Sequence, residues 1–106
     1  MFEPIEMGGT VTWNRISGTN VFYTKKNGVV EVLLGGVSGL TPNAHNTVGT
    51  LPEGYRPKVY AQYFICGDGG NGFTLVGIDN RTGVIDASPK GTSTYAYGST
   101  TYLVDD

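Results

Sequence analysis

The sequence predicts an all-β fold, an antiparallel β-sandwich of jelly-roll type, and three observations support this prediction. Glycine and proline recur so often that no stretch longer than nine residues lacks both. Long helices are therefore disfavoured, because each interior Gly costs about 1 kcal/mol and each Pro about 3 kcal/mol. Valine, threonine, tyrosine, isoleucine and phenylalanine dominate the intervening segments and suit strands. Finally, the regular spacing of turns indicates about eight short strands and no helix.

The first residues are interpreted as a connector to something upstream. We expect residues 1–9 to form a leader or linker, with a hinge at Met7-Gly8-Gly9, and residues 10–106 to form the sandwich domain. Residues 10–16 alternate in polarity, which predicts a strand with Val11 and Trp13 on one face.

A β-hairpin follows. Residues 19–25 and 29–34 are rich in apolar residues and flank Lys26-Asn27-Gly28. Asn-Gly is a strong hairpin signal, because a type I′ turn needs a positive φ at both central residues. The strand is expected to bend or bulge at Gly35-Gly36, and residues 38–46 are expected to form a polar loop.

The segment 47–57 is predicted to be a stiff corner. Pro52 and Pro57 remove two backbone donors, so neither suits the middle of a sheet. Tyr55 and Arg56 are held between them, on a corner that leads into the next strand. We favour a packing role, in which Tyr55 lies flat and Arg56 donates to carbonyls, over a ligand role.

The longest predicted strand is residues 58–66, and it has apolar residues on both faces. Val59 and Ile65 lie on one face, and Phe64 and Cys66 lie on the other. Residues 29–34 show the same pattern. A chain of 106 residues has little material to cover a second face, so we expect a neighbouring subunit to cover it.

The remaining segments are predicted as short strands and turns. We expect strands at 73–78 and 84–87, and one or two strands at 92–104 with a kink at Gly98. The expected loops and turns are residues 67–72, 79–83 and 88–91.

Composition excludes several classes of partner. Charged residues make up 15% of the chain, against about 25% in typical domains. The net charge is −2 and the basic residues are scattered, which argues against nucleic-acid binding. No apolar stretch is long enough for a membrane span. The single cysteine, Cys66, ends an apolar run and is expected to be a small buried hydrophobe.

No catalytic or cofactor motif is evident, and we expect a protein that is not an enzyme. His45 lies in a polar loop, and no Gly-x-Ser-x-Gly sequence accompanies it. No spacing singles out a carboxylate pair for glycoside hydrolysis. The glycine-rich stretch 67–72 is followed by neither a helix nor Lys-Ser/Thr, and it holds one carboxylate. It therefore suits neither phosphate nor calcium.

Saccharide binding fits the residue types best, since sugars are held by aromatic faces and by planar polar groups. The candidates are Trp13, His45, Tyr55, Arg56, Asp79, Arg81, Tyr95 and Tyr97. Each has an alternative role. Trp13 suits a core, His45 a solvated loop, Asp79 and Arg81 a turn, and the tyrosines a subunit interface.

Two segments carry a resemblance to a known family. Residues 25–32, Lys-Lys-Asn-Gly-Val-Val-Glu-Val, and residues 48–57, Val-Gly-Thr-Leu-Pro-Glu-Gly-Tyr-Arg-Pro, are similar to the C-terminal head domain of tail-fibre or baseplate receptor-binding proteins. Those proteins belong to phages and prophages of Gram-positive bacteria. The resemblance extends from about Trp13 to Leu103.

The resemblance implies a homotrimeric β-sandwich that recognises host cell-wall polysaccharide without catalysis. It also implies attachment to an upstream fibre or baseplate protein, synthesis in a bacterial cytoplasm and a place at the virion tail tip. Two alternatives stay open: a structural trimerisation or capping domain without a ligand, and a free-standing bacterial lectin.

Overall fold

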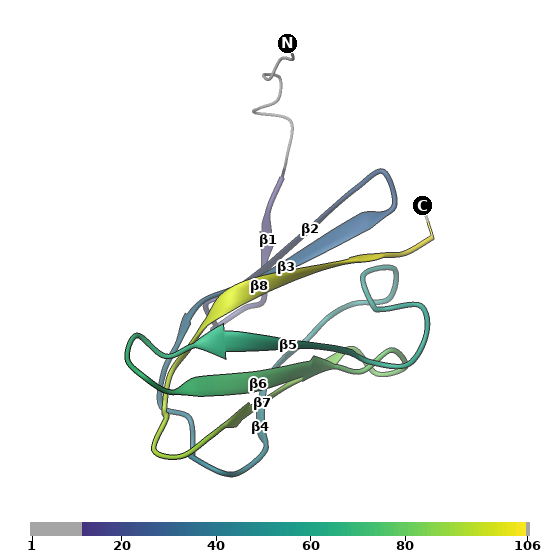
Figure 1. The fold of residues 1–106 in the computed structure, drawn as a ribbon. Helices are drawn as coiled ribbons and strands as arrows, with labels where there is room; N and C mark the ends of the chain where they lie inside the picture. The colour runs from purple at the N-terminus through teal and green to yellow at the C-terminus, as the bar shows by residue number, and fades with distance from the viewer. Residues whose placement is uncertain (1–11, 106) are drawn as a thin grey trace.

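The computed structural model describes residues 12–105, which form eight antiparallel strands and no helix (Figure 1). The strands are β1 (Asn14–Arg15), β2 (Val21–Lys26), β3 (Val29–Val37), β4 (Asn46–Thr50), β5 (Gln62–Gly67), β6 (Phe73–Ile78), β7 (Val84–Pro89) and β8 (Ala96–Leu103). This confirms the predicted all-β, antiparallel class. The predicted leader, residues 1–9, lies outside the described residues. The part of the chain that is described contains no helix able to cross a membrane.

The strands form one curled sheet with two layers. The strand order is β1-β2-β3-β8-β5-β6-β7-β4, and the two halves meet at a single residue pair, Gly67 on β5 and Tyr97 on β8. In Figure 1 the half containing β2, β3 and β8 lies above the half containing β5, β6 and β7. The inner faces enclose the core, which comprises Val21, Val30, Val32, Leu34, Leu40, Leu51, Cys66, Val76, Ile78, Ile85, Ala87 and Ala96.

The β2–β3 hairpin has the predicted turn. Asn27 has φ 54° and Gly28 has φ 76°, so both central residues adopt the conformation that a type I′ turn requires. The predicted bulge is also present: the β3–β8 register shifts between Gly35 and Val37, and Gly36 has φ 106°. Such a bulge locally bends and twists the strand that carries it.

Two predicted strands are shorter than expected. Of the strand predicted at residues 10–16, residues 10–11 lie outside the described residues. Among residues 12–16 only β1 is a strand, and Trp13 precedes it. The strand predicted at residues 58–66 begins at Gln62, because Tyr60 has a left-handed φ of 59° and interrupts the extended backbone. Val59 and Tyr60 therefore lie on an exposed loop.

The remaining differences concern one strand that was not predicted, the end of β7 and the course of β8. β4 was not predicted, because its sequence Asn-Thr-Val-Gly-Thr has one large apolar residue; it is an edge strand paired only with β7. β7 continues to Pro89, two residues beyond the predicted end, and the predicted turn 88–91 begins later. β8 passes Gly98 as one strand without the predicted kink, because β3 pairs with it on both sides of this residue.

The proline-flanked corner has a packing role: Arg56 donates to carbonyls as expected, whereas Tyr55 packs edge-on and not flat as predicted. Arg56 Nε donates to the Leu51 carbonyl at 3.0 Å, and Nη1 donates to the Arg81 carbonyl at 2.8 Å. The Tyr55 ring packs edge-on against Tyr23, with 4.9 Å between ring centroids. These contacts tie the corner to the β6–β7 turn and to β2.

Gly83 is the tightest point of this corner, and its replacement gives a prediction about stability. It has φ 76°, and an added Cβ would collide with the Leu51 carbonyl oxygen and the Arg56 side chain. Gly91 has a similar φ of 68°, but nothing lies within 4 Å of its Cβ position. We expect Gly91→Ala to cost about 1–2 kcal/mol from backbone strain alone and Gly83→Ala about 3–4 kcal/mol. Denaturant unfolding measures both, and equal costs would contradict the close contact at Gly83.

The thiol of Cys66 gives a second prediction. Its side chain has no exposed surface, and burial raises its pKa to about 11. The reactive thiolate is therefore scarce and shielded near neutral pH. We expect iodoacetamide at about pH 8 to label Cys66 only in denaturant, as followed by mass spectrometry. Rapid labelling of the folded protein would show that this part of the core opens.

Candidate functional site

A small hollow lies where the end of the β3–β4 loop meets the outer surface of β5, β6 and β7. Its cavity volume is about 190 Å³. The lining residues are His45, Ala61, Tyr63, Gly77, Asp79, Val84 and Asp86. Pockets for drug-sized ligands start at about 300 Å³, so this hollow suits a single ring or one unit of a longer chain.

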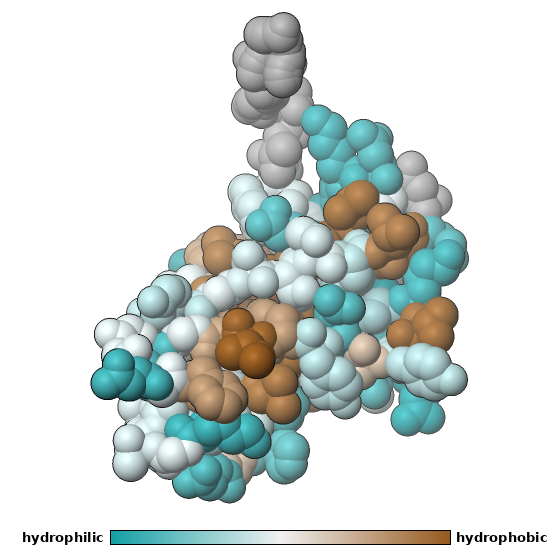
Figure 2. All heavy atoms as spheres, in the orientation of Figure 1, coloured by the Kyte–Doolittle hydropathy of each residue, from teal (hydrophilic) through white to brown (hydrophobic). Residues whose placement is uncertain are grey.

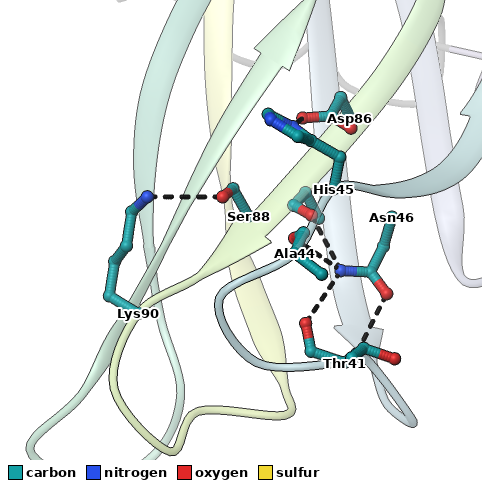
Figure 3. A network of polar contacts seen from close by, with 8 residues as sticks. Thr41, Ala44, His45, Asn46, Asp86, Ser88 and Lys90 are labelled. Carbon is teal, nitrogen blue, oxygen red and sulfur yellow. Dashed lines mark hydrogen bonds and ion pairs between the residues drawn. The ribbon is translucent and has the colours of Figure 1, made fainter.

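His45 and Asp86 form the polar pair of the hollow (Figure 3). His45 Nδ1 lies 2.8 Å from Asp86 Oδ2, and the His45 side chain is 85% exposed. Since a carboxylate only accepts hydrogen bonds, His45 donates from Nδ1. This arrangement orients the imidazole and leaves Nε2 available to a ligand.

The loop that carries His45 is held by its neighbour, Asn46. The Asn46 side chain accepts from the Thr41 amide at 2.9 Å and donates to the carbonyls of Thr41, Ala44 and Ala87 at 3.0–3.1 Å. Figure 3 shows these bonds converging on the amide group. The side-chain amide of Asn46 thus closes the loop and fastens it to β7, which places His45 opposite Asp86.

Tyr63 supplies the aromatic surface of the hollow. It lies on β5 opposite Gly77 of β6, and its side chain is on the outer face with 66% of the residue exposed. A Cβ on Gly77 would lie 2.7 Å from the Tyr63 ring. The absence of a side chain at Gly77 therefore lets the ring lie down on the sheet with one face toward solvent.

Asp79 borders the hollow and also organises the β6–β7 turn. Its Oδ2 accepts hydrogen bonds from the Thr82 amide at 2.7 Å, the Thr82 hydroxyl at 2.9 Å and the Arg81 amide at 3.0 Å. These bonds, those from Thr82 first, lower the pKa of Asp79 below its usual value. The turn role considered from the sequence is therefore present.

Two larger hollows lack this combination of groups. One, of about 340 Å³, is lined by Arg15, Thr19, Asn20 and neighbours but by no aromatic residue. The other, of about 290 Å³, is lined by Arg56, Lys58, Arg81, Asp105 and neighbours, again without an aromatic ring. Two donors of Arg56 bind carbonyls, and Lys58 pairs with Asp105 at 3.0 Å. Volume alone therefore does not decide the site.

In this hollow the structure brings together two of the eight candidates from the sequence, His45 and Asp79. Arg81 lines the hollow of about 290 Å³, and Tyr55 and Arg56 pack in the proline-flanked corner, residues 47–57. Tyr95 and Tyr97 lie together, with 6.1 Å between ring centroids, at the start of β8. Trp13 is 41% exposed next to β1, so it is not the core residue considered as its alternative.

Tyr63 and Asp86 line this hollow but were not among the candidates from the sequence. The predicted alternation of residues 58–66 did place Tyr63 and Ile65 on one face. No sequence pattern indicates that this face is bare at Tyr63, or that Asp86 pairs with a histidine 41 positions away. Residues 12–105 contain no cluster of three His, Cys, Asp or Glu side chains that could hold a metal ion.

Comparisons with known proteins address the fold. No family model matches the sequence, and no curated protein does. One similar solved structure is the head domain of phage bIL170, from a study of the receptor-binding domains of lactococcal phages. The TM-score is 0.55 at 16% identity, covering 90% of this chain and 99% of that one. The chain shares its fold with a phage head domain. This confirms the fold that the sequence resemblance implied.

Asp79 gives a prediction about acid stability. A lowered pKa in the folded state means that the carboxylate stabilises the fold above its unfolded pKa of about 3.9. This contribution is lost as the pH falls through the folded pKa. We expect Asp79→Asn to be less stable than the original chain at neutral pH, with a difference that shrinks in acid.

The measurement is denaturant unfolding across a pH series. Asp105→Asn is the matched control, since this carboxylate is exposed and meets only Lys58 among the described contacts. Such surface pairs contribute little to stability, so the control should follow the original chain. A difference for Asp79→Asn that does not vary with pH would contradict the turn role of the carboxylate.

Proposed function

We propose that this chain is a non-catalytic receptor-binding head domain of a phage tail protein and that it recognises a saccharide on the host cell surface. The observation that carries the proposal is the hollow in which a bare tyrosine ring adjoins a histidine–carboxylate pair. The fold shared with the bIL170 head domain supports the receptor-binding part.

The chemistry of the hollow matches that of a sugar ring. The exposed face of Tyr63 can lie beneath the C–H surface of a pyranose. His45 Nε2 and the carboxylate of Asp86 stand beside it and can bond adjacent hydroxyls. The shape and polarity thus suit one sugar unit of a surface polysaccharide, held with modest affinity at each site.

The weak single site requires several copies to act together. The resemblance implies a homotrimer joined to an upstream fibre or baseplate protein at the virion tail tip, and a cell-wall polysaccharide of a Gram-positive host as the receptor. Tethered sites bind a repeating polymer at high effective concentration, which raises the avidity by orders of magnitude. The whole particle can then bind its receptor tightly although each single site binds weakly.

A structural capping domain without a ligand is the second candidate. It is favoured by the uncharged outer face of β5, β6 and β8, which suits assembly rather than recognition. Under this alternative, no saccharide binds at the hollow, and replacing its residues has no effect on any interaction.

Binding to purified wall polysaccharides and to a glycan array tests the proposal. We expect reproducible binding to particular glycans, weakened by about tenfold or more in Tyr63→Ala and in Asp86→Asn, since each removes a ligand contact. Tyr63→Ala removes the stacking of the sugar on the ring, and Asp86→Asn removes a negative charge and so weakens the hydrogen bonds to the sugar hydroxyls.

Arg15→Ala and Arg81→Ala are the matched controls, because each alters one of the two larger hollows. Both should bind as the original chain does. Silence across host glycans would favour the capping domain, and a loss confined to a control variant would move the site to that hollow.

A further inference from the structure

We infer that the outer surface of β5 carries a second saccharide subsite, centred on the ring of Tyr97, and that one ligand chain contacts this ring and the hollow at Tyr63 together. The ligand of this surface is a stretch of several neutral sugar units. The inference rests on the proposed function and extends it, because it assigns a longer ligand than the single unit that fills the hollow.

The Tyr97 ring is held in the same way as the Tyr63 ring. An added Cβ on Gly67 would lie 3.3 Å from Cζ and Oη of Tyr97, and one on Gly77 would lie 2.7 Å from the Tyr63 ring. In both cases the glycine is the cross-strand partner of the tyrosine. Each ring therefore lies down on the sheet. Tyr97 is 49% exposed, so one face of its ring is open to solvent.

The two rings lie on the same side of the sheet. Successive side chains of a strand point to opposite faces, and Cys66 of β5 and Ala96 of β8 are buried in the core. Their neighbours Gly67 and Tyr97 therefore face outward. Tyr63, three positions before Cys66, faces outward as well and is 66% exposed. A ligand on the outer surface can thus meet both rings.

The spacing of the rings sets the length of the ligand. The Tyr97 ring lies over Gly67 on β5, and the Tyr63 ring lies over Gly77 on β6. Because Gly77 pairs with Tyr63, the rings are four residues apart along the strands and one strand apart across them. This separation is about 14 Å, at about 3.4 Å per residue and about 4.8 Å between strands. It exceeds the width of one pyranose ring, so the two stacked sugars are separate units of one chain.

The surface between the rings is apolar and uncharged. Ile65 is 67% exposed there and pairs with Leu75, and Phe73 beside Gly67 is 44% exposed. Figure 2 shows hydrophobic residues gathered over β5 and β6. The strands β5, β6 and β8 contain no charged residue. This surface suits the C–H faces of neutral sugars and offers no opposite charge to an ionic unit.

The two ends of this surface differ in their polar groups. At Tyr63, the pair formed by His45 and Asp86 stands beside the ring and can bond hydroxyls. Near Tyr97, the carboxylate of Asp68 already accepts hydrogen bonds from its own loop and from a serine of the β7–β8 loop. The hollow therefore selects the sugar, and Tyr97 adds stacking area that is tolerant of the unit it meets.

Saccharide fragments of different length test the inference. The probes are fragments of one to about six units, made by mild acid hydrolysis of a wall polysaccharide that the intact chain binds and then separated by size. We expect NMR titration to show about five- to tenfold tighter binding of the longest fragments than of fragments of one or two units, because only long fragments reach Tyr97. Tyr97→Ala should remove this gain and leave the binding of short fragments unchanged.

Three further variants define the role of the ring. Tyr97→Phe keeps the ring and should bind long fragments as the original chain does. Gly67→Ala keeps the tyrosine but lifts its ring through the added Cβ, and it should lose most of the gain. Trp13→Ala is the matched control, since Trp13 is 41% exposed but lies next to β1, at one end of the strand order. It should leave both affinities unchanged.

The outcomes separate this inference from the proposed function. Equal binding of short and long fragments, with Tyr63→Ala still weakening both, would overturn the second subsite and leave the proposed function standing. Silence of the intact chain across wall polysaccharides would overturn both. A changed mass of Tyr97→Ala in light scattering, with unchanged affinities, would assign the ring to a protein contact and also overturn the subsite.

A measurement on the original chain covers the case in which circular dichroism shows that Tyr97→Ala does not fold. The methyl NMR signals of Ile65 report on the surface between the rings. Long fragments should shift these signals, and fragments of one or two units should not. Binding of long fragments without any shift at Ile65 would contradict the path along β5.

Discussion

The packing between the inner faces of the two layers is the interaction on which the rest of this structure depends. The halves of the sheet share one residue pair, Gly67 with Tyr97, so backbone hydrogen bonds contribute little to holding them together. Side chains such as Leu34, Ile78 and Ile85 have no exposed surface and fill the space between the layers.

The sequence predicted those features that local chemistry determines. Asn27-Gly28 set the hairpin and its register, and the paired glycines at 35–36 marked the bulge, because their backbone requirements do not depend on distant residues. The start of β5 was predicted wrongly, since Tyr60 adopts a left-handed conformation that its residue type disfavours. β4 was missed because its short polar sequence becomes a strand only through pairing with β7.

The candidate site was only partly predictable for a related reason. A loop histidine among asparagines was recognised as a candidate, but its partner Asp86 is far away in sequence and is brought near by strand order. The tyrosines were recognised as a class. The sequence did not show which tyrosine rings lie flat on the sheet, because this depends on a glycine in the facing strand, as at Gly77 opposite Tyr63.

The Asn46 side chain anchors the His45 loop through backbone groups. Its amide bonds to the backbone of Thr41, Ala44 and Ala87, so this fastening does not depend on the side chains of Ala44 and His45. Asn43, by contrast, is itself bonded to the backbone of Gly91. Positions 44 and 45 can therefore be exchanged while the loop keeps its path. Under the proposed receptor-binding function, substitutions at these positions would alter what this rim prefers without rebuilding the scaffold, which is a simple route to a changed host range.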